Sequence, residues 1–324
     1  MRRSPALLLP AVLVALLAAC TGTHAPAPVA SPAPLGVRPL GAADPAVIPG
    51  TSAGPAQTCD PLASLRPPAS LPAARAMPAG STMARIFANG RLVVGVNQNT
   101  YLFGSRDPAS GQIVGFDIDI AREIARAIFG DPDKVQLKAI TSAQRIPFVN
   151  GGQVDIVAET MTINCARWQQ VAFSTDYFDA GQRILVTRGS PVRGPQDLGG
   201  KKVCAAAGST SIQNIAGLAA HPVPVSVNDW TDCLVMLQQG QVDAVSTDDT
   251  ILIGLAKQDP HTVVVGDKFT REPYGLAIKN TSPDFVRFVN GVLDQMRADG
   301  TWARIYSRWL GAPVPAPPPA RYKD

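Results

Sequence analysis

Residues that could hold an anion gather near the middle of the chain. An apolar run at Val154–Ala158 predicts a buried strand, and Asn164 is suited to cap a short helix that carries Arg167 in its first turn. Thr160 and Thr162 lie between them and add hydroxyl groups. A helix N-terminus offers unpaired N–H groups and a partial positive charge, and a guanidinium matches a carboxylate. The pattern therefore predicts an anion site; a surface arginine that pairs with a neighbouring acid is the simpler alternative.

The spacing of these residues resembles that of a known family. The chain carries the pattern Thr162-x4-Arg167-x5-Phe173-Ser174-x2-Tyr177, preceded by Val154-Asp155-Ile156-Val157. This is similar to the core motif of the polar amino-acid-binding proteins that serve ABC importers, and the likeness covers most of residues 91–310. In that family the equivalents of Thr162 and Arg167 grip the α-carboxylate of a free amino acid.

The resemblance points to family 3 of the bacterial extracellular solute-binding proteins, and within it to the glutamate/aspartate/glutamine-binding branch. It implies an α/β fold of the type II periplasmic-binding-protein-like class. Such a fold has two α/β lobes, joined by two crossover strands, with a ligand cleft between them.

Contacts to the ligand side chain follow from the same resemblance. Residues 140–147 are similar to a stretch of the glutamate/aspartate branch in which a serine and an arginine contact ligand oxygens, which implies Ser142 and Arg145. Asn97 falls where that branch has another arginine, so one cationic partner for an acidic side chain is missing. Asn97 and Tyr101 follow the first expected strand, at the end where α/β sheets place ligand contacts. An arginine on a helix surface is the alternative for Arg145.

The second half of the chain repeats this arrangement. A strand is expected at Lys202–Ala206, and the small-residue turn after it contains Ser209 and Thr210. Backbone amides of this turn could close on the carboxylate held by Arg167. A phosphate cradle is the rival interpretation, but the Lys-Ser/Thr ending of a Walker loop is missing.

A carboxylate for the ligand ammonium is expected at the end of a later strand. The segment AVSTDDTIL resembles the family stretch whose aspartate binds the α-amino group, and its spacing assigns that role to Asp248. Asp249 is expected to cap the helix that follows.

The elements that position these residues are predicted from hydrophobic spacing. Phe116, Ile120, Ile124 and Ile128 form one face of a helix that ends at Gly130. Within this helix the acids Asp117 and Asp119 are expected to be capping and surface groups. Further strands are predicted at Leu92–Val96, Val135–Ile140, Arg183–Arg188, Val223–Val227, Val242–Ser246 and Val263–Gly266.

The N-terminus has the form of an export signal. Arg2 and Arg3 precede the apolar run Leu7–Leu17, which is too short to span a bilayer. The following residues end in Cys20 and resemble a bacterial lipobox, so Cys20 is expected to carry lipid. An ordinary signal peptide is the alternative. From Cys20 to about Ala56 the chain is rich in Ala and Pro and lacks periodicity, which predicts a tether without folded contacts.

Four further cysteines suggest disulfides in an oxidising compartment, with three possible connectivities. We favour Cys204–Cys233, within one βαβ unit, and Cys59–Cys165, which would fasten the N-terminal extension beside the Arg167 helix. The spacing is not that of a zinc site, and no metal or cofactor is expected. The net charge of +4 is unclustered, so nucleic acid is not an expected partner.

The expected organisation follows from these features. It comprises a signal peptide (1–19), an acylated tether and N-terminal extension (20–85), the first part of lobe 1 (86–180), lobe 2 (181–271), the return to lobe 1 (272–311) and a Pro-rich tail (312–324).

The sequence predicts a non-enzymatic, monomeric receptor that is lipid-anchored to the outer face of the bacterial cell membrane. It would bind glutamate or aspartate first, asparagine or glutamine next, and deliver the amino acid to an ABC importer. Two alternatives stay open. The loaded protein could dock on a membrane sensor, or Glu159 could serve as the general acid of a cyclohexadienyl-dehydratase-like enzyme.

Overall fold

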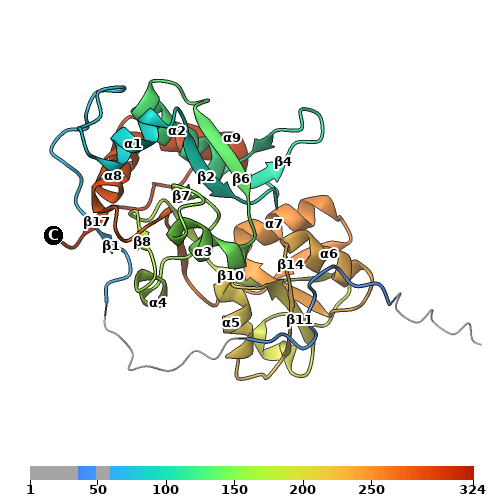
Figure 1. Ribbon diagram of the computed structural model, residues 1–324. Helices are drawn as coiled ribbons and strands as arrows, with labels where there is room; N and C mark the ends of the chain where they lie inside the picture. The colour runs from blue at the N-terminus through green and yellow to red at the C-terminus, as the bar shows by residue number, and fades with distance from the viewer. Residues whose placement is uncertain (1–35, 49–58) are drawn as a thin grey trace, which may run out of the picture. The chain divides into compact units, whose positions relative to one another are not determined.

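The computed structural model describes residues 36–48 and 59–324, which contain two α/β lobes (Figure 1). The expected signal peptide and the lipidation site Cys20 lie outside the described residues. Of the helices within the described ranges, none is long and apolar enough to cross a bilayer.

The first lobe is built on a mixed sheet with the strand order β6-β2-β7-β16-β8. Its strands β2, β6 and β7 are parallel, whereas β16 is antiparallel to both of its neighbours. These strands are β2 (Leu92–Val96), β6 (Val135–Ala139), β7 (Ile156–Val157), β8 (Ala172–Phe173) and β16 (Ala277–Ile278). A small antiparallel sheet adds β3 (Asn99–Thr100), β4 (Gly104–Arg106) and β5 (Ile113–Val114).

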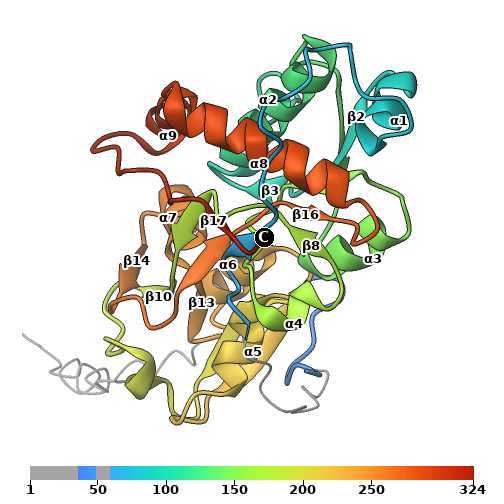
Figure 2. The same cartoon turned by 90° about the vertical axis from the view of Figure 1, so that its left-hand side faces the viewer.

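Helices α1, α2, α8 and α9 pack together beside this sheet (Figures 1 and 2). The apolar face predicted for α2 is confirmed, because Phe116, Ile120, Ile124 and Ile128 are fully buried and Gly130 ends the helix with a φ of 73°. The helices of this lobe are α1 (Thr82–Ala88), α2 (Phe116–Phe129), the 3₁₀ turn η1 (Ser142–Gln144), α3 (Arg145–Asn150), α4 (Cys165–Trp168), α8 (Pro283–Ala298) and α9 (Thr301–Leu310).

The second lobe has a sheet of the same size with the order β12-β11-β13-β10-β14. Strands β11, β12 and β13 are parallel, and β10 is antiparallel to β13 and β14. The strands are β10 (Gln182–Thr187), β11 (Lys202–Ala206), β12 (Val223–Val227), β13 (Ala244–Asp248) and β14 (Thr262–Val265). The helices are η2 (Pro195–Leu198), α5 (Thr210–Ala216), α6 (Trp230–Gln238) and α7 (Asp249–Gln258).

Two short strands connect the lobes. Strand β9 (Phe178–Ala180) leads into the second lobe, and β15 (Glu272–Tyr274) returns from it. The two strands pair antiparallel, and the rings of Phe178 and Tyr274 stack with their centroids 5.7 Å apart. The two crossovers implied by the resemblance are therefore present.

Part of the expected tether makes folded contacts. Ala43 and Ser226 exchange backbone hydrogen bonds of 2.8 and 3.0 Å at the edge strand β12, and Asp44 accepts a hydrogen bond from Lys202 at 2.7 Å. The prediction of a tether without folded contacts is wrong for residues 37–48. Composition did not reveal that an open strand edge and a lysine would supply partners.

The C-terminal segment returns to the first lobe after α9 (Figure 2). Its strand β17 (Arg321–Tyr322) pairs in parallel with β1 (Ala63–Ser64), and Arg321 forms a 2.7 Å ion pair with Asp60. The N-terminal and C-terminal extensions thus form one ribbon on this lobe.

Both predicted disulfides are present. Cys59 is bonded to Cys165, and Cys204 is bonded to Cys233. The first bond joins the N-terminal extension to α4; the second joins β11 to α6 inside the core of the second lobe.

Candidate functional site

Helix α4, a single turn, presents Arg167, and its cap is the predicted one. The Asn164 side-chain oxygen accepts a hydrogen bond of 2.8 Å from the Arg167 backbone N–H. The Arg167 guanidinium is buried and donates from Nη1 to the Thr162 carbonyl at 2.7 Å. The guanidinium is therefore folded back over the turn that precedes its own helix.

A second guanidinium, that of Arg145 on α3, lies beside it. Arg145 Nε donates to the Ser142 carbonyl and Nη1 to the Glu159 carbonyl, both at 3.0 Å. The Nη2 atoms of Arg145 and Arg167 both donate to the carbonyl of Gly208, at 3.4 and 3.3 Å. Two side chains of the first lobe thus converge on one backbone oxygen of the second.

These guanidinium groups are suited to hold an anion. Arg145 is 3% exposed and Arg167 is 8% exposed, and neither takes part in an ion pair with any residue the structure describes. Burial, and then the charge of Arg145, lower the pKa of Arg167 to about 9. A carboxylate bound here would relieve the repulsion between two desolvated cations.

A pocket of about 330 Å³ opens at the two arginines. It is lined by Ser142, Ala143, Arg145, Ile146, Pro147, Met161, Arg167, Gln170 and Gly208. The structure therefore brings the predicted residues Ser142, Arg145 and Arg167 to one pocket, and Gly208 contributes to it from the second lobe.

The predicted ammonium partner, Asp248, is the last residue of β13 and is buried. Its Oδ2 accepts a hydrogen bond of 2.7 Å from the Tyr274 hydroxyl, whereas its buried Oδ1 has no hydrogen-bond partner among the residues that the structure describes. Burial, and then the charge of Glu272, raise the pKa of Asp248 to about 8. Weaker electrostatic influences link Asp248 with Arg167 and with Arg145, so the acid and the guanidinium groups act in one buried environment.

Thr162 was predicted to supply a hydroxyl group and the Thr210 turn to supply backbone amides, but the side chains of both threonines share an acceptor that was not predicted, Glu272. The Thr162 Oγ1 and Thr210 Oγ1 atoms donate to Glu272 Oε2 at 2.7 and 2.8 Å, and they lie 3.3 Å from each other. In this arrangement Glu272, at the start of β15, links a threonine of each lobe. The sequence indicated Glu272 only by its position at the return crossover, because its hydrogen bonds to Thr162 and Thr210 join residues far apart in sequence.

Asn97 lies at the end of β2 beside Glu159. Its Nδ2 donates to Glu159 Oε1 at 3.4 Å, while the buried Glu159 Oε2 has no hydrogen-bond partner within residues 36–48 and 59–324. Burial raises the pKa of Glu159 to about 8, and the charge of Arg145 opposes this rise. A carboxyl group that can donate or accept a hydrogen bond therefore lies next to the predicted side-chain partner, Arg145.

Thr160 owes its position to Asp117 of α2. The Thr160 backbone N–H donates to Asp117 Oδ2 at 2.8 Å, the Tyr177 hydroxyl donates to Oδ1 at 2.7 Å, and Thr160 has a φ of 39°. The expectation that Asp117 is a capping and surface group is wrong, because it is a buried acceptor that connects α2 to the turn before α4.

Other predicted residues lie apart from this network. Ser209 caps α5, accepting from the Ile212 backbone N–H at 3.2 Å, and Tyr101 is 45% exposed. Their ligand contacts remain predictions. The expectation for Asp249 is wrong: the N-cap of α7 is Asp248, and Asp249 pairs with Lys268 at 3.0 Å.

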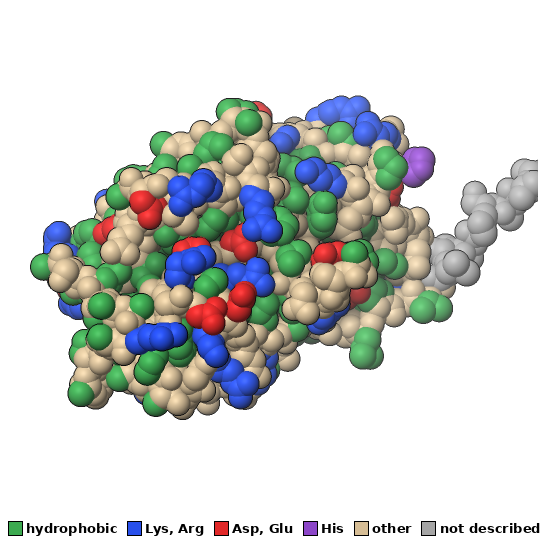
Figure 3. Space-filling model, turned by 90° about the horizontal axis from the view of Figure 1, so that it is seen from above, with side chains coloured by type: hydrophobic (Ala, Val, Ile, Leu, Met, Phe, Trp, Pro, Cys, Tyr) green, Lys and Arg blue, Asp and Glu red, His purple; other side chains and the backbone are tan. Residues whose placement is uncertain are grey.

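A second hollow lies between α2 and α9, where acidic and basic side chains intermingle on the face shown in Figure 3. Its charges are compensated by local ion pairs, such as Arg126–Glu123 at 3.1 Å and Arg308–Asp119 at 3.5 Å. Charges that are already paired with one another in this way hold a ligand weakly. Within the described ranges, no group of three or more His, Cys, Asp or Glu side chains could hold a metal ion.

Comparison with known proteins decides the family. Residues 92–312 match the model of the bacterial extracellular solute-binding proteins, family 3. The chain belongs to this family. It is 42% identical over 230 residues to the ABC transporter glutamine-binding protein GlnH of Bacillus subtilis (strain 168), covering 71% of this chain and 84% of that protein. It is 30% identical over 247 residues to the glutamate/aspartate import solute-binding protein of Salmonella typhimurium, covering 73% of this chain and 82% of that protein.

Solved structures agree with this assignment. An ancestral arginine-binding protein bound to glutamine aligns with a TM-score of 0.65 and 36% identity, over 69% of this chain and 99% of that chain. The holo arginine-binding protein of T. maritima aligns with a TM-score of 0.63 and 30% identity, over 69% of this chain and 99% of that chain. The predicted family and the type II periplasmic-binding-protein-like fold are confirmed.

Proposed function

We propose that this solute-binding protein holds a free polar amino acid between its lobes and delivers it to an ABC importer. A free amino acid is a zwitterion, and burying it requires a partner for each charge. The observation that supports this function most directly is the pair of buried guanidinium groups together with Asp248, whose Oδ1 has no hydrogen-bond partner in the described part of the chain. Arg167 and Thr162 would take the α-carboxylate, and Asp248 the α-ammonium.

Closure of the lobes belongs to this mechanism. Arg167 and Asp248 lie on different lobes, and the Arg167 guanidinium already contacts Gly208 of the second lobe at 3.3 Å. A ligand that touches both lobes binds the closed state better than the open one, so binding favours closure. Micromolar affinity corresponds to about −8 kcal/mol, a magnitude that a few charge-assisted hydrogen bonds can supply.

The side-chain end of the ligand would face Arg145 and Ser142. A cation and a nearby hydroxyl group favour a carboxylate, so glutamate and aspartate are proposed first. Glu159 supports glutamine or asparagine as the second candidate, since its buried carboxyl group could accept a hydrogen bond from the amide NH₂. The names of the relatives include both glutamine-binding and glutamate/aspartate import proteins.

The two candidates are distinguished by Arg145→Ala. Isothermal titration calorimetry is expected to show a much larger loss of affinity for glutamate than for asparagine, because only glutamate loses an ionic partner. Equal losses for both ligands would show that Arg145 does not contact the side chain.

Membrane attachment is the remaining part of the proposal. A lipid on Cys20 would hold the receptor at the outer face of the cell membrane, next to a permease. Mass spectrometry of the protein purified from membranes would detect the acylated N-terminal peptide. An unmodified N-terminus that begins after Cys20 would contradict the proposed lipid anchor.

We propose no catalytic role for this chain. Glu159 accepts a hydrogen bond from Asn97 and has no histidine or cysteine among the contacts described for it. Purified protein is expected to leave prephenate and arogenate unchanged, and turnover of either compound would make the chain an enzyme.

A thermal-shift screen of the twenty common amino acids tests the function as a whole. A ligand that binds only the folded state raises the apparent melting temperature by mass action. A shift is expected with acidic and amide amino acids, and none with amines that lack a carboxylate, which are added to the screen as controls. A screen without any shift, supported by calorimetry, would reject the proposed function.

A further inference from the structure

We propose that the Cys59–Cys165 disulfide is a positioning link for Arg167, so that ligand affinity depends on the oxidation state of this pair. The proposal rests on the proposed function, in which Arg167 holds the ligand carboxylate. The link involves the N-terminal and C-terminal extensions, and neither extension contributes a residue to the pocket at Arg145 and Arg167.

Helix α4 is too short to be stable by itself, so its position depends on contacts with other segments. It has four residues, fewer than an isolated helix needs, and its local support is the Asn164 cap together with one hydrogen bond of 3.1 Å from the Trp168 backbone N–H to the Asn164 carbonyl. The Trp168 ring packs against Phe173 of β8, with the ring centroids 5.5 Å apart, and further contacts come from the two extensions. Cys165 is bonded to Cys59, the Trp168 indole N–H donates to the Pro61 carbonyl at 2.9 Å, and Lys323 Nζ lies 4.0 Å from the centre of the Trp168 ring.

The segment that carries Cys59 is itself firmly held. Ser64 Oγ donates to the Phe173 carbonyl at 2.6 Å, and Asn290 Nδ2 donates to Ser64 Oγ at 2.9 Å. The ion pair between Asp60 and Arg321 adds the C-terminal strand. Cys59 therefore connects α4 to a segment that is hydrogen-bonded to buried residues of the first lobe.

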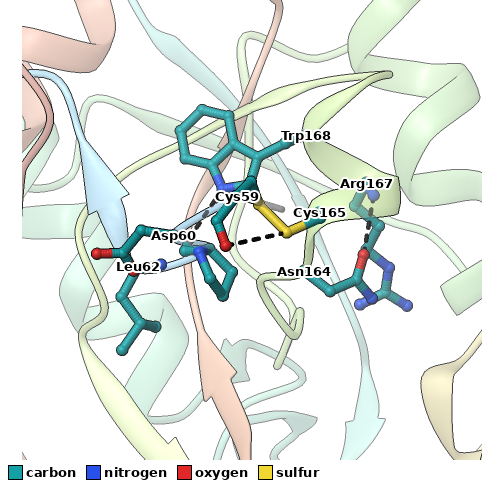
Figure 4. Close-up of a disulfide and its surroundings, with 8 residues drawn as sticks. Cys59, Asp60, Leu62, Asn164, Cys165, Arg167 and Trp168 are labelled. Carbon is teal, nitrogen blue, oxygen red and sulfur yellow. Dashed lines mark hydrogen bonds between the residues drawn. A yellow bond between two sulfur atoms is a disulfide. The ribbon is translucent and has the colours of Figure 1, made fainter. Parts of the chain in front are cut away.

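The link and the ligand-binding group lie on different sides of α4. Figure 4 shows the disulfide and Trp168 on one side of the helix and the Arg167 side chain on the other. The disulfide thus does not occupy the pocket, whose lining residues include Arg167 but neither cysteine. It fixes the backbone two residues before Arg167 and so determines where the guanidinium enters the pocket.

The two disulfides differ in their access to a reductant. Cys59 is exposed and Cys165 is half-buried, whereas Cys204 and Cys233 are both 0% exposed. A dithiol such as dithiothreitol transfers two electrons to the S–S bond, which breaks to give two thiols while the reagent forms a cyclic disulfide. Because attack requires access to a sulfur atom, Cys59–Cys165 is expected to be reduced first.

The experiment compares oxidised and partly reduced full-length protein. Alkylation and peptide mapping identify conditions under which Cys59 and Cys165 are reduced while Cys204–Cys233 stays intact. L-glutamate and L-glutamine are then titrated by calorimetry. Reduction is expected to weaken binding by about tenfold, equivalent to about 1.4 kcal/mol. Unchanged affinity after demonstrated reduction would overturn the proposal.

Two variants separate positioning from general stability. Cys59→Ser/Cys165→Ser is expected to bind like the reduced protein and to be insensitive to dithiothreitol. In Arg167→Lys, which keeps a cation but not the guanidinium geometry, reduction is expected to have little further effect, since the link acts through Arg167. An equal tenfold loss in Arg167→Lys would show that the disulfide supports the lobe in general. If the double variant fails to fold, the partly reduced wild-type protein still supplies the comparison.

A ligand-independent measurement distinguishes this inference from the proposed function. Amide hydrogen exchange in the ligand-free protein is expected to show a loss of protection on reduction that is confined to residues 160–170. Loss of protection spread over the whole lobe, or none, would contradict positioning. Failure of every amino acid to bind the oxidised protein would instead reject the proposed function, whatever the exchange result.

Discussion

Asp248 and Glu159 are buried carboxyl groups, and an amino acid bound in the proposed site would act on them in opposite ways. Burial raises the pKa of each to about 8. An ammonium group next to Asp248 favours its ionised form, whereas a carboxylate next to Glu159 favours its neutral form. In the proposed site, the same direction of pKa shift would support general recognition of α-amino acids at Asp248 and side-chain selection at Glu159.

Asp248→Asn is expected to weaken binding of every α-amino acid by at least about thirtyfold, since removing one partner of a buried ion pair costs about 2 kcal/mol or more. Calorimetry with glutamate and glutamine measures the loss. The control is Asp249→Asn, a neighbouring acid that pairs with Lys268. Micromolar binding retained by Asp248→Asn would remove this residue from the site.

The pH dependence of selectivity reports on Glu159. Below about pH 8 the Glu159 carboxyl group is neutral and does not repel an acidic ligand. Above that pH it is ionised, so it should repel the glutamate side chain and accept a hydrogen bond from the glutamine amide. The preference for glutamine over glutamate should rise by about tenfold between pH 7 and pH 9. The effect of Asp248 cancels in this ratio, because both ligands carry the same ammonium group. Glu159→Gln should make the ratio independent of pH; a flat ratio in the unaltered protein would contradict this role.

At the scale of elements, Asp117 joins α2 to the turn that precedes α4. It accepts hydrogen bonds from the Thr160 backbone and from the Tyr177 hydroxyl, and both donors are buried. The proposed anion site would therefore depend on α2, a helix with no residue among those that line the pocket at Arg145 and Arg167.

Asp117→Ala is expected to lower the free energy of unfolding by about 2 to 4 kcal/mol, because two buried donors lose their acceptor. Urea denaturation followed by circular dichroism measures this change. Asp133→Ala is the matched control: its side chain is 81% exposed and should alter stability by less than about 0.5 kcal/mol. Similar values for the two variants would show that the Asp117 contacts are not important for folding.

Elements and contacts that depend on residues close together in sequence were predicted correctly, whereas contacts between distant residues were missed. Strands β2, β11 and β12, helix α2 and the Asn164 cap were predicted within a residue, since hydrophobic periodicity and capping are local signals. The family motif added Arg167 and Asp248. The buried role of Asp117 was missed because its partner Tyr177 is 60 residues away, and Glu272 was missed for the same reason. Residues 37–48 pack along the edge of strand β12, and no local sequence pattern predicts this contact.

At the scale of the whole molecule, we expect ligand binding to depend on how closely the two lobes approach each other at Gly208. This residue has a φ of 75°, and a Cβ atom there would lie 2.7 Å from the Cα of Ala143 on the first lobe. The obstacle is backbone, so side-chain rotation cannot remove it. Only glycine permits both guanidinium groups to reach the Gly208 carbonyl.

Gly208→Ala should therefore hold the lobes apart and weaken ligand binding by about tenfold or more, since closure is part of the binding equilibrium. The matched control is Gly240→Ala in the second lobe: its φ is 67°, but no atom lies within 4 Å of the added Cβ. Both variants are expected to lose about 1 kcal/mol of stability from the left-handed backbone. Only Gly208→Ala should lose affinity in calorimetry and keep a larger radius of gyration with saturating ligand in small-angle scattering. Equal affinity in the two variants would mean that contact at Gly208 is not required for closure.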